Sequence, residues 1–137
     1  MSQNHPLAKF EIPRDEITRV VTVFYARVRV HPHLAPVFSR HIDDWPAHEA
    51  TVADFWANAI LGDRSYSGNV MATHTKAGDV KPGMFSSWLG LFDQVLAEEL
   101  DAETARKWSA LAHKIGGPLR AAVVDREKHP GGVPKLF

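Results

Sequence analysis

Four stretches of the chain carry apolar residues at helical spacing, and this pattern limits the possible fold more than any other feature. The four apolar stripes are Ile17, Val20, Val21, Phe24 and Val28; Val52, Phe55, Trp56, Ala59 and Ile60; Phe85, Trp88, Leu89, Phe92, Val95 and Leu96; and Trp108, Leu111, Ala112, Ile115, Leu119 and Val123. Each stripe repeats every three or four residues, as one face of an amphipathic helix does. The pattern predicts an all-α domain of four long helices with short connectors.

Local signals mark the ends of the first two long helices. Pro13 fits the first turn of one helix, because a residue there needs no backbone N–H. Asp44 can cap the next helix, Pro46 fits its first turn, and Gly62 ends it in the usual C-terminal position. Residues 33–40 between these helices predict a short helical turn.

The second half of the chain contains two further long helices. Residues 63–69 predict a polar loop, and Val70–His74 a short helical element at most. One long helix is expected from about Met84 to Leu100, and the last one follows a cap at Asp101. The run Gly116-Gly117-Pro118 predicts a kink or a split in that last helix.

The chain has 137 residues, which is the length of one domain. We expect a flexible N-terminal arm over residues 1–12, one domain over 13–128, and a flexible tail over 129–137. The sequence contains no internal repeat and no stretch whose composition indicates a domain boundary.

Charge and cysteine content exclude several classes of function. Sixteen basic residues balance sixteen acidic ones, so no net field recruits nucleic acid or an anionic membrane. The chain has no cysteine, which excludes disulfides, iron–sulfur clusters and covalent haem attachment. It also has no secretory signal and no membrane-spanning run. These features predict a cytoplasmic protein that holds any cofactor noncovalently.

Four separated residues are candidates for chemistry: Tyr25, His48, His74 and Trp88. Tyr25 lies at the edge of the first apolar stripe, where its hydroxyl needs a partner. His48 shares a helix face with Val52, and Trp88, whose indole N–H can only donate, lies within the third stripe. His74 has no long helix to pack it inward. Taken singly, each also fits a structural interpretation: a core tyrosine, a half-buried histidine, a core tryptophan and a surface histidine.

His48-Glu49 matches the opening of a zinc-protease motif. Val52 stands where the second histidine of that motif must be, so we exclude a metalloprotease. His31, His33 and His41 have no spacing typical of a metal site.

Seven short motifs occur in an order that resembles the truncated haemoglobins, specifically the third of their three subgroups. The motifs are Val23-Phe24-Tyr25, Pro36-Val37-Phe38, Trp45-Pro46-Ala47-His48, Phe55-Trp56-Ala57, Leu61-Gly62, Thr73-His74 and Trp88-Leu89-Gly90-Leu91-Phe92. The other two subgroups carry Gly-Gly pairs near the start of helix B and before the proximal helix. This chain lacks both pairs.

This resemblance implies a shortened globin fold in which two antiparallel helix pairs, B/E and G/H, sandwich haem b. It implies that His74 is the proximal iron ligand and that Phe38 packs against the porphyrin. Tyr25, His48 and Trp88 then correspond to the distal polar residues. The expected apolar pocket walls are Val52, Phe55, Trp56, Phe85 and Phe92, together with the ring of Trp88.

The expected ligands are O2, NO, CO or similar small molecules. Several distal donors favour ligand capture or redox chemistry, such as nitric oxide oxidation or peroxide handling, over bulk oxygen transport. Turnover would then need an external reductase, and we expect a monomer or weak dimer. Two alternatives stay open: a cofactor-free helical interaction module, and a non-haem metal site using His48, His74 and a carboxylate.

Overall fold

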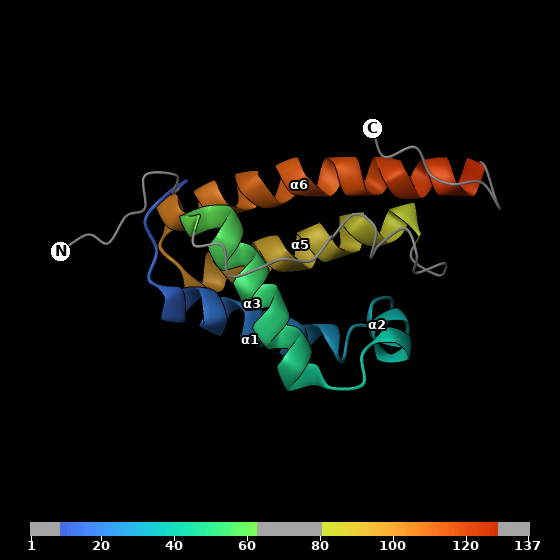
Figure 1. The fold of residues 1–137 in the computed structure, drawn as a ribbon, viewed down its shortest axis with the longest axis horizontal. Helices are drawn as coiled ribbons and strands as arrows, with labels where there is room; N and C mark the ends of the chain where they lie inside the picture. Colours follow the sequence, from blue (N-terminus) through green and yellow to red (C-terminus); the bar gives the residue numbers. More distant parts are fainter. Residues whose placement is uncertain (1–8, 63–80, 129–137) are drawn as a thin grey trace.

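The computed structural model describes residues 9–62 and 81–128, and all regular structure within them is helical (Figure 1). The helices are α1 (Arg14–Val28), α2 (Ala35–His41), α3 (Trp45–Leu61), α5 (Pro82–Glu99) and α6 (Ala102–Lys128). This confirms the predicted all-α class and the four long helices. The predicted polar loop, the short helical element at Val70–His74 and the predicted tail over 129–137 lie outside the described residues.

The long helices form two pairs. α5 packs along α6, and α1 packs on α3 and also contacts α5. Figure 1 shows that α5 and α6 run in opposite directions side by side, while α3 crosses α1 obliquely as the chain returns. α1 and α3 therefore correspond to the predicted B/E pair, and α5 and α6 to the G/H pair. None of the described helices is both long and apolar enough to span a membrane.

The predicted apolar stripes meet in one main core. Its largest fully buried side chains include Trp108, Phe24 and Phe92, which come from α6, α1 and α5. A second, smaller cluster lies between α5 and α6 and contains Phe85, Leu119 and Val123. The fold therefore buries aromatic rings from every long helix at the place where the two pairs meet.

The predicted ends of α3 are confirmed. The Asp44 carboxylate accepts a hydrogen bond from the Ala47 backbone N–H at 3.1 Å, which caps the first turn. Gly62 ends the helix with φ of 71°, a left-handed conformation that favours glycine. These two residues determine where α3 starts and stops, and so place His48 in its first turn.

Residues 9–12 belong to the predicted flexible arm, but in the structure they lie against the core. The Lys9 backbone N–H donates to the Ile60 carbonyl at 2.7 Å, next to the end of α3. Phe10 and Ile12 are 9% and 7% exposed and join the main core cluster. Burial of these two apolar side chains offsets the entropy that residues 9–12 lose when they become ordered. The composition of the segment did not reveal this contact with the core.

The predicted break at Gly116-Gly117-Pro118 does not split α6, which continues from Ala102 to Lys128 with Pro118 inside it. A proline ring normally clashes with the Cβ of the residue before it in a helix. Gly117 has no Cβ, so this clash is absent. Leu119 and Val123, which are 7% and 0% exposed, then hold the second half of α6 against α5.

This explanation predicts opposite outcomes for two glycine substitutions. A Cβ added at Gly90 or at Gly117 would meet nothing within 4 Å outside its immediate chain neighbours. Gly90→Ala should therefore stabilise the protein by about 0.5–1 kcal/mol through helix propensity. Gly117→Ala should leave the free energy of unfolding unchanged or lower it, because the new Cβ meets the Pro118 ring. Urea denaturation of both variants measures this, and an equal gain from the two would contradict the explanation.

Among the described residues, four ion pairs join α1 and its C-cap residue Arg29 to α3 and α5. Arg27 pairs with Glu98, and Arg19 Nε contacts Glu99 Oε1 at 3.3 Å, which links α1 to α5. Arg14 with Asp54 and Arg29 with Glu49 link α1 to α3 at two separate points. Glu98 and Glu99 thus join α5 to α1.

Candidate ligand-binding site

Tyr25 lies at the centre of an aromatic group contributed by three helices. Its ring centroid is 4.9 Å from that of His48, 5.8 Å from Phe38 and 6.2 Å from Trp45. The His48 ring meets it edge-on, at an interplanar angle of 86°. Tyr25 is 3% exposed, so its side chain is almost completely buried. We call these four residues the tyrosine group.

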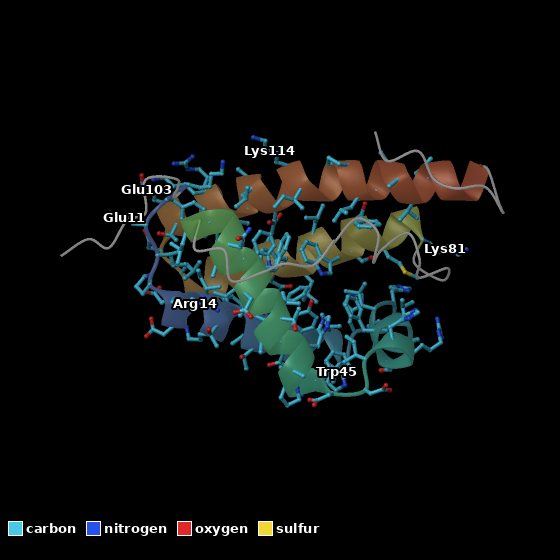
Figure 2. The ribbon with its side chains drawn as sticks, viewed as in Figure 1. Glu11, Arg14, Trp45, Lys81, Glu103 and Lys114 are labelled. Atoms are coloured by element: carbon cyan, nitrogen blue, oxygen red, sulfur yellow. The ribbon has the colours of Figure 1, made fainter. Side chains whose placement is uncertain are left out.

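Local sequence explains how these side chains converge. Tyr25 follows Val21 by one helical turn, so it faces the core with the α1 stripe. Trp45 and His48 are three residues apart in the first turn of α3, and therefore share one face. Figure 2 labels Trp45 at the beginning of this helix. Phe38 comes from α2, the short helix between α1 and α3 in the sequence.

Burial and a nearby charge control the ionisation of Tyr25. Burial raises the pKa of its hydroxyl well above the ordinary value, and the Glu49 carboxylate raises the pKa further. The hydroxyl therefore keeps its proton throughout the physiological pH range. A protonated phenol can donate a hydrogen bond to a small polar ligand.

A second aromatic group surrounds Trp88. Its ring stacks on Phe92 with a centroid distance of 5.2 Å and an angle of 10°. Phe92 stacks in turn on Trp56 at 5.5 Å and 12°, and Trp108 meets Phe92 edge-on at 5.5 Å. We call Trp88, Phe92, Trp56 and Trp108 the tryptophan group. It unites aromatic side chains of α3, α5 and α6.

Phe24 connects the two groups. Its ring meets Tyr25 at 5.0 Å, Trp88 at 5.4 Å and Phe92 at 5.2 Å, each time edge-on. The structure therefore brings Tyr25, His48 and Phe38 together, and brings Trp88 together with Trp56 and Phe92. One buried phenylalanine packs against both groups.

The remaining expected pocket residues lie in different places. Val52 and Phe55 are partly buried against the main core, and Phe55 packs edge-on against Trp56 at 5.1 Å. Phe85 packs with Leu119 and Val123 in the second cluster, at the beginning of α5. His74, the expected iron ligand, lies outside the described residues.

Phe24 and Trp45 are members of the site that the sequence analysis did not single out. Trp45 could have been found from its spacing, since it lies one helical turn before His48 and Glu49. Phe24 looks like an ordinary stripe residue in the sequence, and only its contacts show that it joins two groups.

The alternative of a non-haem metal site uses His74, which lies outside the described residues, so it stays a hypothesis. Within 9–62 and 81–128, no group of three His, Cys, Asp or Glu side chains is arranged to hold a metal ion. His113, an exposed histidine of α6, instead bonds Asp93 Oδ2 through Nε2 at 2.8 Å, and Asp93 also accepts from Ser109 at 2.6 Å.

Two antiparallel helix pairs that meet at buried aromatic groups define a shortened globin fold. A crystal structure of group III truncated hemoglobin from Campylobacter jejuni superposes with a TM-score of 0.79 and 26% identity, over 82% of this chain and 92% of that one. The protein called group 3 truncated hemoglobin ctb, from the same organism, is 32% identical over 93 residues, which are 64% of this chain and 73% of that protein. No protein-family model matches the chain. The chain belongs to the group 3 truncated haemoglobins, which confirms the resemblance seen in the sequence.

Proposed function

We propose that this protein binds haem b noncovalently and uses it to bind O2, NO, CO or similar small ligands. Membership of the globin family supports this proposal. The observation that carries it is the tyrosine group, in which the ring of a buried, protonated tyrosine packs edge-on against an imidazole. A polar donor set of this kind, enclosed by aromatic rings, suits a small polar ligand rather than a large one.

The chemistry of the side chains fits haem. Tyr25, His48 and Trp88 can each donate a hydrogen bond, while Phe24, Phe38 and Phe92 provide apolar aromatic surface beside them. A porphyrin needs such flat apolar walls. The ligand bound to it needs polar donors on one side.

In this proposal His74 holds the haem iron, and Phe38 packs against the macrocycle. The pocket walls come from aromatic and aliphatic side chains of α3 and α5: Val52, Phe55, Trp56, Phe85, Trp88 and Phe92. When bound, haem supplies an iron centre that takes diatomic ligands and shifts electron density onto them. The absence of cysteine is in keeping with a cofactor held without covalent attachment.

Tyr25 and Trp88 are the proposed direct donors to the ligand, and His48 acts as a gate or as the partner of Tyr25. A hydrogen bond to a charged acceptor contributes about 1.5–3 kcal/mol. Two or three such donors would make ligand release slow, which favours capture or redox chemistry, such as nitric oxide oxidation or peroxide handling, over transport. That chemistry requires a separate reductase. We propose a cytoplasmic protein that acts as a monomer or weak dimer.

One set of spectra tests the proposal. Purified protein titrated with haem should show a strong Soret band that shifts when the reduced form takes carbon monoxide. His74→Gly should lose the normal spectrum and recover it when imidazole is added, because free imidazole can replace the missing ligand. His113→Ala, which changes an exposed histidine bonded to Asp93, should behave like wild type.

Two results would overturn the proposal. Wild-type protein without a Soret band after haem addition would favour the cofactor-free interaction module. Stoichiometric iron or zinc without porphyrin would favour the non-haem metal site.

A further inference from the structure

Arg29, the residue that follows α1, contacts the first turn of α3 at two points. Its guanidinium forms an ion pair with the Glu49 carboxylate. Its central carbon also lies 4.8 Å from the centroid of the Trp45 ring, within the range of a cation–π interaction. Arginine suits both contacts, because its planar group can bond a carboxylate and stack on an aromatic face together.

These two contacts flank His48. Trp45 precedes His48 by three residues and Glu49 follows it directly, so all three belong to the opening turns of α3. The centroid of the Trp45 ring also lies 6.2 Å from that of Tyr25 and 6.4 Å from that of His48. The Glu49 side chain is only 15% exposed, compared with 41% for Arg29. The ion pair is thus more shielded from water than an ordinary surface pair.

The first turn of a helix is the part most prone to fraying, because its backbone N–H groups have no partners within the helix. In α3 the Asp44 cap satisfies the N–H of Ala47. Arg29 adds a tertiary contact that ties this turn to the end of α1. His48 keeps its position against Tyr25 only while the turn stays helical.

We propose that Arg29, Glu49 and Trp45 form a clamp that positions His48 against Tyr25 and thereby limits ligand entry. Arg29 and Glu49 are positioning residues, since they act through the first turn of α3. The role in ligand entry rests on the proposed haem function. The contact of Arg29 with the first turn of α3 does not depend on haem, because it is a property of the chain itself.

The chain offers a matched control. Arg14 and Asp54 form an ion pair between the same two helices, and Arg14 lies near the opposite end of α1 from residue 29 (Figure 2). Their side chains are 42% and 40% exposed. Asp54→Asn therefore removes a helix-joining charge pair without touching the opening turn of α3.

The first measurement is backbone hydrogen exchange over residues 47–50, with and without haem. Arg29→Met should raise exchange there about five- to thirty-fold, which corresponds to loss of one ion pair and one cation–π contact. Glu49→Gln removes only the ion pair, so it should raise exchange less, by up to about five-fold. Arg29→Lys should give a smaller increase, since lysine keeps the charge but not the planar fork. Asp54→Asn should leave exchange at 47–50 as in wild type.

The second measurement is carbon monoxide association after flash photolysis. Glu49→Gln and Arg29→Met should accelerate association, and high salt should move wild type towards the rates of these variants. Unchanged exchange in both variants, or an equal change in Asp54→Asn, would overturn the clamp. Faster exchange with unchanged association would overturn its role in ligand entry. If wild-type protein bound no haem, the proposed function and the role of the clamp in ligand entry would both be overturned. The exchange measurement would still decide whether Arg29 stabilises the first turn of α3, which carries His48.

Discussion

Replacing Tyr25 with phenylalanine should speed oxygen release about ten- to a hundred-fold, because the variant lacks the hydroxyl that we propose donates to the ligand. The phenylalanine ring keeps the edge-on packing against Phe24, His48 and Phe38. The change thus removes one donor and little apolar contact. Stopped-flow mixing of the oxygenated protein with a ligand trap measures the release rate.

Carbon monoxide provides a control within the same variant. A charge-assisted hydrogen bond is about twice as strong as a neutral one, and bound oxygen carries more negative charge than bound carbon monoxide. Release of carbon monoxide from Tyr25→Phe should therefore change less than release of oxygen. If oxygen release did not accelerate, Tyr25 would have no role as a donor, and its buried hydroxyl would be structural.

The sequence predicted the helices well because their signals are local. Asp44 and Gly62 determine the ends of α3 through contacts with residues at most four positions away. Of the kink or split predicted at Pro118, the split is wrong, since α6 continues through this residue. Proline normally disturbs a helix, but the preceding glycine and the burial of Leu119 and Val123 preserve it here. Such compensation depends on neighbours in space.

Less of the site could be predicted from residue patterns alone. Helical spacing correctly placed Tyr25 on a core-facing stripe and Trp88 among apolar residues, but spacing does not say which stripes face one another. Contacts such as Arg29 with Glu49 join residues whose approach depends on how α1 crosses α3. The ordered set of motifs supplied the family, which no single residue indicated.

Replacing Trp108 with alanine should destabilise the protein by about 3–5 kcal/mol, which is a large part of the stability of a typical domain. Trp108 is 0% exposed and packs edge-on against Phe92 at 5.5 Å and Trp56 at 5.6 Å. Its removal leaves a cavity where α3, α5 and α6 meet. Denaturation of wild type and variant at equal haem loading measures the loss of stability. Loading must be equal because bound haem itself raises the apparent stability.

Trp108→Phe separates packing from polarity. The indole Nε1 of Trp108 is buried and has no hydrogen-bond partner among the described residues, so the wild-type ring carries the cost of an unsatisfied donor. Phenylalanine fills much of the volume without a polar atom, and its cost should be far smaller than that of alanine. Val30→Ala, at an 80% exposed position, should change stability little. If phenylalanine cost as much as alanine, packing of the whole indole ring would outweigh the cost of its unsatisfied donor. If alanine cost little, the aromatic stack would not hold the two helix pairs together, and the site between them would need another support.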